Sequence, residues 1–217
     1  MDISYSGGMD STALAIWAKQ QGYEITLHFA DTGAELPETL WFIPRVAKEL
    51  DAKLIVYSGA TFFQILIKRG YLPSWRVRWC TKELKVKVLP HDAAIGICAN
   101  ESHRMQGSFR PLVDAGIDED EAVNICKKKN LINPIYGWRT HSSCFCCPFQ
   151  RKSDWLGMAK KHPNLYELSE EWENYSASTN GFMFHENYSL KQLREAKQAE
   201  IDLFDEEIDS ACAICVI

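Results

Sequence analysis

The first half of the chain alternates short apolar segments of strand length with longer segments of helical periodicity, and this alternation constrains the fold most. Strands are expected at residues 3–5, 25–30, 53–57 and 93–99, and helices at residues 10–21, 36–50 and 61–69. Strands and helices that alternate through short links form parallel strands joined by right-handed crossovers. The sequence therefore predicts an α/β fold with a parallel, twisted sheet and helices on both faces.

Two local expectations follow from this alternation. Ligands of parallel sheets bind beyond the carboxyl ends of the strands, so the loops after Tyr5, Ala30 and Ala99 are expected on one rim. Pro44 lies inside the second helical segment, where proline removes a backbone hydrogen bond, so we expect a kink or break there.

The second half has a different organisation. Helices are expected at residues 118–129, 154–161, 164–173 and 190–204, and residues 133–150 form an irregular stretch that contains several cysteines. No linker is long enough to separate two independent domains. We therefore expect one compact unit, in which an α/β core of residues 1–130 carries a C-terminal extension of residues 131–217.

Ser6, Gly7 and Gly8 lie between the first strand and the first helix, where an anion can bind. Glycine lets the backbone approach a phosphate without an intervening Cβ, and a helix N-terminus presents free N–H groups and a partial positive charge. Ser11 adds a hydroxyl, and Asp10 is expected either to orient a Mg²⁺ ion or to cap the helix. The loop lacks the lysine of the Gly-Lys-Ser/Thr phosphate loop, and two glycines alone would also fit an ordinary turn.

The whole hexapeptide Ser6-Gly7-Gly8-Met9-Asp10-Ser11 resembles the SGGxDS signature of the PP-loop ATP pyrophosphatases, also called adenine nucleotide α-hydrolase-like enzymes. Three further segments resemble motifs of the PAPS (phosphoadenosine phosphosulfate) reductase branch of that family: residues 29–39, residues 78–85 with Arg-Trp-Cys-Thr-Lys-Glu-Leu-Lys, and residues 96–104. The resemblance covers about residues 2–175.

This resemblance implies a chemistry and a set of residues. PP-loop enzymes bind ATP and commonly cleave it between the α and β phosphates, which gives an adenylylated substrate and pyrophosphate; PAPS reductases attack a sulfonucleotide instead. Charge that builds on the phosphate or sulfate must be neutralised. The implied nucleotide-binding residues are Ser6, Gly7, Gly8, Asp10, Ser11, Asp31, Thr32 and Glu35, with Asp31 near the adenosine. The implied catalytic residues are Asp10, Ser11, Arg78, Lys85 and Arg104, of which the three cations balance phosphate charge.

Eight cysteines are many for a chain without a visible secretory signal, and reduced thiols inside cells are often buried, catalytic or metal-bound. Cys144 and Cys147 have the CxxC spacing that can hold one metal or part of a cluster. With Cys80 they could hold a 4Fe–4S iron–sulfur cluster, and Cys146 is a further candidate ligand; zinc and unligated thiols are the alternatives. Relatives in the family, including adenylylsulfate reductases and DNA phosphorothioation proteins, carry such clusters. Cluster-binding reductases have an adjacent cysteine pair where this chain has only Cys80, and here the adjacent pair comes later.

Basic residues surround Cys80, namely Arg76, Arg78, Lys82, Lys85 and Lys87, and we expect them to lower the pKa of its thiol. We interpret these basic residues either as an anion-binding surface or as a solvated face. The net charge of −5 does not indicate nucleic-acid binding over the whole surface. Trp75, Trp79 and Trp138 could stack on a base or pack in the core. Cys98 and Cys126 are expected to be small core residues, and His141 an ordinary surface residue.

The leading hypothesis is an ATP pyrophosphatase that adenylylates a substrate for sulfur transfer. By resemblance, one setting is DNA phosphorothioation, with a cysteine desulfurase or another sulfur donor as partner and DNA reached through partner proteins. The alternatives are a PAPS or adenylylsulfate reductase, for which Cys212 or Cys215 in the tail would be essential, and a non-catalytic nucleotide-binding subunit that senses redox state. No membrane span or secretory signal is visible, so a cytoplasmic location is expected. A homodimer is compatible with the family.

Overall fold

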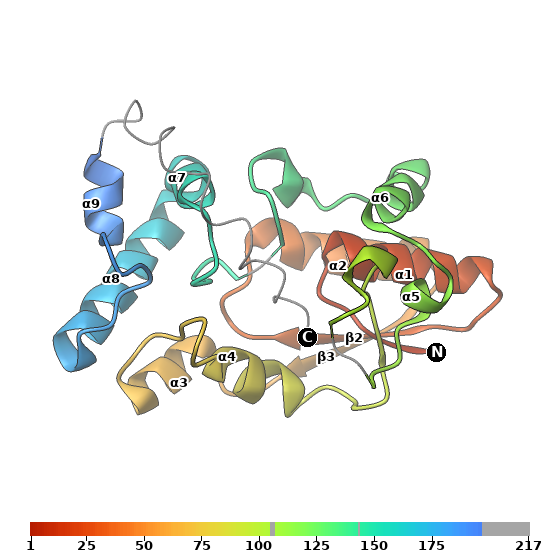
Figure 1. The fold of residues 1–217 in the computed structure, drawn as a ribbon, viewed down its shortest axis with the longest axis horizontal. Coiled ribbons are helices and arrows are strands. Elements are labelled where there is room, and N and C mark those ends of the chain that lie inside the picture. The colour runs from red at the N-terminus through yellow and green to blue at the C-terminus, as the bar shows by residue number, and fades with distance from the viewer. Residues whose placement is uncertain (105–106, 143, 197–217) are drawn as a thin grey trace.

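The computed structural model describes residues 1–104, 107–142 and 144–196 (Figure 1). At its centre is a parallel sheet in the order β3-β2-β1-β4. The strands are β1 (Asp2–Ser4), β2 (Thr26–Asp31), β3 (Lys53–Ser58) and β4 (Ala94–Ile95). Ile3 at the centre lies opposite Leu27 on one side and Ala94 on the other. The predicted α/β class and the parallel direction of the strands are confirmed.

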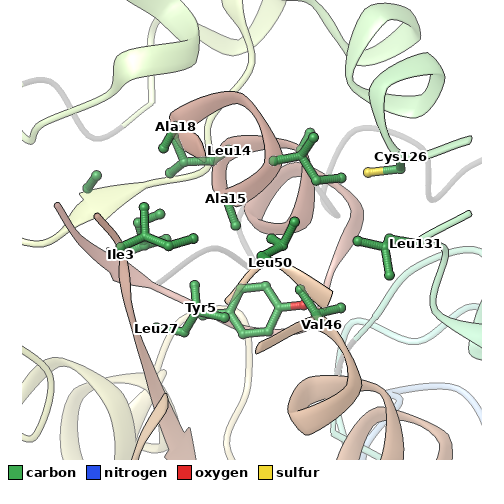
Figure 2. Packing of buried hydrophobic residues seen from close by; sticks show 14 of the residues in the cluster. Ile3, Tyr5, Leu14, Ala15, Ala18, Leu27, Val46, Leu50, Cys126 and Leu131 are labelled. Atoms are coloured by element: carbon green, nitrogen blue, oxygen red, sulfur yellow. The ribbon is translucent and has the colours of Figure 1, made fainter. Parts of the chain in front are cut away.

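The main core lies between the sheet and the helices α1 (Met9–Gln20), α2 (Pro37–Glu49) and α6 (Glu119–Lys128). Figure 2 shows Leu14, Ala15 and Ala18 of α1 within this core, near Ile3 of β1. α1 is apolar nearly all round because α6 packs on it as well as the sheet. Cys98 and Cys126 are both fully buried, which confirms the prediction that they are core residues.

The second helix does not break at its proline. α2 runs from Pro37 to Glu49 with Pro44 inside it, so the expected break is absent. Pro44 is exposed, and so is Leu40, whose carbonyl loses its helical partner at Pro44. Water can satisfy that carbonyl, because this side of the helix faces solvent.

The fourth strand is much shorter than predicted. The apolar run 93–99 forms a ladder only at Ala94–Ile95, and a 3-10 turn, η2 (Ala99–Glu101), begins at Ala99. The run is apolar because it is buried, since Ile97 and Cys98 are fully buried without being part of the ladder. The apolar run in the sequence therefore correctly indicated burial but overestimated the length of the strand.

A second hydrophobic cluster joins the two halves of the chain. It is built from α3 (Phe62–Arg69), α4 (Trp79–Thr81), the π-helical turn η1 (Lys82–Val86), the 3-10 turn η3 (Pro134–Gly137), α7 (Lys152–Lys161), α8 (Pro163–Asn180) and α9 (Leu190–Glu195). Trp172 of α8 lies with its ring centroid 5.3 Å from Phe62 and 5.2 Å from Phe145. This cluster takes side chains from both sides of residue 130. The proposed boundary at that residue stays a prediction.

The remaining helix is the short α5 (Pro111–Asp114). In Figure 1, α1, α2 and α6 lie on one side of the sheet, and α3 and α4 lie on the other. Of the helix predicted at residues 190–204, the described part is α9, and residues 197–204 lie outside the described residues. None of the helices in the described ranges combines the length and the apolar character needed to cross a membrane.

Candidate nucleotide and thiol site

The loop between β1 and α1 is held in an open, anion-binding shape by its own hydroxyls. Gly7 has φ +75°, a conformation that favours glycine, and Gly8 caps α1. Gly8 N donates to Ser6 Oγ at 3.3 Å, and Ser6 Oγ lies 3.2 Å from Ser11 Oγ. Asn133 Nδ2 donates to the carbonyl of Gly7 at 3.0 Å, so the irregular second-half segment fixes the loop from behind.

A cavity of about 440 Å³ opens over this loop. It lies at the carboxyl end of the sheet, as expected for a parallel α/β protein. The lining comes from the loop and α1 (Ser6, Gly8, Met9, Asp10, Ser11), from the segment after β4 (Gly96, Glu101, Arg104), from α6 (Glu119, Val123), and from the irregular segment (Tyr136, Thr140, His141, Ser142). We call it the nucleotide pocket, because its volume is in the range of small-molecule sites.

Carboxylates outnumber cations in this pocket. Asp10, Glu101 and Glu119 line it against the single guanidinium of Arg104, which is ion-paired with Glu101. Burial, followed by the charges of Glu101 and Glu119, raises the pKa of Asp10 from 3.8 to about 6. A site of this kind favours a ligand that brings a cation with its phosphates.

His141 lies in the same pocket and is positioned by a buried carboxylate. Asp154 is 1% exposed and accepts from Thr140 N at 3.0 Å and from Thr140 Oγ1 at 3.2 Å. Thr140 Oγ1 in turn lies 2.9 Å from His141 Nδ1. Because the hydroxyl donates to Asp154, its lone pair accepts the Nδ1–H of a neutral imidazole. Burial, followed by Arg139, lowers the pKa of His141 from 6.5 to about 4, so the ring is neutral at pH 7.

A second, smaller cavity of about 50 Å³ contains the thiols. Its lining includes Cys80, Cys144 and Cys147, the cations Arg78 and Lys85, and the polar side chains Ser6, Thr32, Glu35, Thr39, Thr81 and Ser142. We call it the thiol pocket. Arg78 is held by a bond from Nη2 to Thr81 Oγ1 at 3.3 Å, and its guanidinium carbon lies 5.4 Å from the ring centroid of Phe149. The buried Nε of Arg78 has no hydrogen-bond partner among the described residues.

The thiols are buried, and burial decides their acidity. The expected lowering of the Cys80 pKa is wrong: burial raises it, with Cys147 adding to the rise, and Lys85 only partly opposes this. Burial, with Glu35 next, likewise raises the pKa of Cys144. Cys146 is fully buried in the second hydrophobic cluster and does not line the pocket.

The structure thus gathers most of the predicted residues into two adjoining cavities. The predicted loop residues line the nucleotide pocket, except Gly7, whose role is to shape the loop. Thr32 and Glu35 line the thiol pocket instead, and Asp31, which lines neither pocket, accepts from Gly33 N at 2.9 Å within its own turn. Cys212 and Cys215 lie outside the described residues.

Ser6 and Ser142 line both pockets and form the wall between them. The approach is close, because a Cβ built on Gly8 would lie 2.5 Å from Ser142 Oγ. His141, which no sequence pattern singled out, and Ser142 reach the site only through the path of the irregular segment.

The donor set decides what these thiols could hold. Within residues 1–104, 107–142 and 144–196, no three Cys, His, Asp or Glu side chains are grouped so that they could hold one metal ion. A tetrahedral zinc needs four ligands within about 2.3 Å of the metal. A cluster would take its thiolates on different irons, so Cys80, Cys144 and Cys147, which line one pocket with two cations, would not need to meet at a single metal ion.

A parallel sheet whose glycine-containing loop joins β1 to α1 below a rim pocket defines an α/β nucleotide-binding protein of the PP-loop, adenine nucleotide α-hydrolase-like type. The comparison with protein families makes this specific. Residues 1–106 match the phosphoadenosine phosphosulfate reductase domain, so this part of the chain is a domain of the PAPS reductase family.

Two proteins of the archaeon Methanocaldococcus jannaschii are similar to this chain. The uncharacterized protein MJ0973 is 34% identical over 89 residues, which are 41% of this chain and 21% of that protein. The uncharacterized protein MJ0066 is 24% identical over 200 residues, which are 79% of this chain and 40% of that protein. The chain therefore spans less than half of either relative.

Proposed function

We propose that the chain is an ATP pyrophosphatase that adenylylates an acceptor for sulfur transfer. The observation that carries this proposal is the adjacency of the two pockets, one built for phosphates and the other for sulfur chemistry, with Ser6 and Ser142 in the wall between them. An acceptor oxygen would attack the α-phosphorus, and the bond to the bridging oxygen of the β-phosphate would break. Pyrophosphate would leave with that electron pair, held by the positive N-terminal end of α1 and by the hydroxyls of Ser6 and Ser11.

The charge of the nucleotide pocket favours ATP with Mg²⁺ over PAPS. Asp10, Glu101 and Glu119 attract a divalent ion that bridges the phosphates. PAPS carries an additional 3′-phosphate, and one guanidinium that is already paired with Glu101 is poor compensation for it. Asp10 is the residue we assign to orient the ion.

We assign Cys80, Cys144 and Cys147 to hold an iron–sulfur cluster, with Arg78 and Lys85 offsetting its negative charge. When bound, such a cluster supplies electron transfer or an open iron site for sulfur. Cys146 would have to leave the hydrophobic cluster to become a fourth ligand, so we expect three protein thiolates.

A backbone phosphate of DNA is the acceptor we favour, with a cysteine desulfurase as the source of sulfur. Arg78 supports this choice, because its buried Nε–H has no partner among the described residues and can meet an anion in the thiol pocket. Hydrosulfide, released from the desulfurase persulfide by a thiol reductant, would then attack the DNA phosphorus and displace AMP, so that a P–S bond replaces the broken P–O bond. Mass spectrometry of digested DNA, after incubation with ATP, the desulfurase, cysteine and a thiol reductant, should show phosphorothioate dinucleotides; unmodified DNA would exclude this acceptor.

The primary test is anaerobic incubation of the purified chain with ATP, Mg²⁺ and the candidate acceptor, with chromatography of the products. AMP and pyrophosphate are expected, and Glu119→Gln should slow their formation. Asp120→Asn is the matched control, because Asp120 is the next residue of α6, is exposed and does not line the pocket. Release of sulfite from PAPS would support a reductase instead, and intact bound ATP would support a regulatory subunit.

The cluster is tested separately by iron and sulfide assays. Cys144→Ala should lose iron, whereas Cys126→Ala, a thiol buried against α1, should retain it. A wild-type protein without iron after anaerobic purification would contradict the cluster and leave the ATP reaction standing.

A further inference from the structure

The three tryptophans that could stack on a base have different surroundings in the structure. Trp79 is 3% exposed in the second cluster, and Trp138 is half-buried and donates to Glu38 at 3.1 Å. Trp75 is 61% exposed and has the highest exposure among the exposed large hydrophobic side chains of the described residues. Of these three tryptophans, Trp75 is therefore the one whose ring is exposed at the surface.

Trp75 lies at the tip of a short closed turn. Ser74 N donates to the carbonyl of Val77 at 3.1 Å, and Val77 N donates to Ser74 Oγ at 3.2 Å. These two bonds fix the backbone of residues 74–77, so the turn itself has little further ordering to lose on binding. The guanidinium carbon of Arg76 lies 4.6 Å from the ring centroid of Trp75.

The cations around this turn divide into two groups. Arg69 and Lys87 are ion-paired with Glu83, at 3.2 Å and 2.5 Å. Arg76 and Lys82 are exposed and form no salt bridge among the described residues, although the charge of Lys82 helps to lower the pKa of Glu83. Arg78, which follows the turn, lines the thiol pocket. Unpaired charge thus leads from the outer surface to the candidate site.

We propose that residues 74–77 and Lys82 form a binding surface for single-stranded nucleic acid, with Trp75 as the base-stacking platform. An exposed indole stacks on any unpaired base, and this is worth about 1–3 kcal/mol per base. Arg76 and Lys82 neutralise neighbouring phosphates and release counterions. A duplex offers no free base face to the ring. The surface deepens the proposed function, because it names the kind of acceptor strand that reaches the thiol pocket.

The chain contains a matched control for this surface. Trp41 on α2 is 59% exposed, and the guanidinium carbon of Arg45 lies 5.5 Å from its ring centroid. This pair has the same chemistry but lies on α2, outside the surface of residues 74–77 and Lys82. A nonspecific affinity of exposed tryptophans would affect both sites equally.

The experiment measures the fluorescence anisotropy of labelled single-stranded DNA, single-stranded RNA and the corresponding duplex. Each strand has about 16 nucleotides, the upper end of the site sizes known for single-strand binding folds. Trp75→Ala should weaken single-strand binding by about 5- to 160-fold, Trp75→Phe should recover most of the loss, and Trp41→Ala should have no effect. The double variant Arg76→Ala/Lys82→Ala should reduce the salt slope by about 1.4, or about 0.7 for each phosphate contact.

Equal binding by the wild type and Trp75→Ala, tighter binding of the duplex, or no binding at low salt would each overturn the surface. ATP cleavage without nucleic acid is measured in parallel. A chain that binds the strand through Trp75 but leaves ATP intact overturns the proposed function alone. A chain that cleaves ATP but binds no strand overturns this inference alone.

Discussion

Asp10 is predicted to lower the stability of the folded chain at neutral pH. Its pKa is raised from 3.8 to about 6, chiefly by burial and then by Glu101 and Glu119, so the folded state favours the protonated carboxyl. The cost of ionisation is absent below pH 3.8 and complete above about pH 6. At about 1.36 kcal/mol for each pKa unit, the cost reaches about 3 kcal/mol. We treat this as an upper bound, since Asp10 borders an open pocket.

Asp10→Asn removes this cost and also removes a favourable interaction. Asp10 is the second residue of α1, where a negative charge gains about 0.3–1 kcal/mol from the helix dipole. We therefore expect a net stabilisation of about 2 kcal/mol at pH 7.5, which corresponds to a rise of about 4–8 °C in Tm for a chain of this size. The gain should disappear near pH 4, where Asp10 is protonated in the folded state.

The assay is urea unfolding of both proteins at pH 4.5 and pH 7.5 without metal or nucleotide. Asp120→Asn is the matched control, because Asp120 is the second residue of α6 but is exposed, so only its dipole interaction is lost. That variant should be slightly less stable than the wild type at both pH values. An Asp10→Asn protein that is no more stable at pH 7.5, or equally stabilised at both pH values, would refute the reasoning.

Two further predictions concern the rim of the nucleotide pocket. Gly96→Ala would bring a Cβ within 2.6 Å of the backbone nitrogen of Ser11, so we expect a loss of about 1–3 kcal/mol and weaker ATP binding by calorimetry; Gly59→Ala, which meets nothing within 4 Å, should change neither. The pKa of His141 is lowered from 6.5 to about 4, so its contribution to stability is present above pH 6.5 and lost as the pH falls toward 4. His141→Gln should reduce the loss of Tm between pH 7 and pH 5. The control variant His91→Gln, at an exposed position, should leave that loss unchanged. Equal pH dependence of the wild type and His141→Gln would contradict the prediction.

The sequence predicted the elements whose signals are local. The strands of the first half and their connecting helices follow from apolar periodicity, and the loop at Ser6–Ser11 follows from its glycines and its place before a helix. Local patterns also failed in identifiable ways. Residues 93–99 are apolar because they are buried beside α1, and only Ala94–Ile95 pair as a strand.

The site needed the tertiary structure because its chemistry depends on burial. Basic neighbours in the sequence indicated an acidic Cys80 thiol, but the fold buries that thiol and places Cys147 near it, which raises the pKa. His141 belongs to a segment without periodicity, and its contact with Asp154 through Thr140 depends on where α7 packs. Neither effect is encoded by the spacing of residues along the chain.

The shared wall of Ser6 and Ser142 has a consequence for reaction timing. In the reaction that we propose, an adenylylated intermediate would lie one layer of side chains from the thiols, so the second half-reaction would require no diffusion through solvent. Hydrolysis of the intermediate would then compete with attack by a neighbouring sulfur group, and not with attack by a sulfur group that must first diffuse to it. The efficiency of sulfur transfer per ATP would be set by the thickness of this wall more than by the affinity for either substrate.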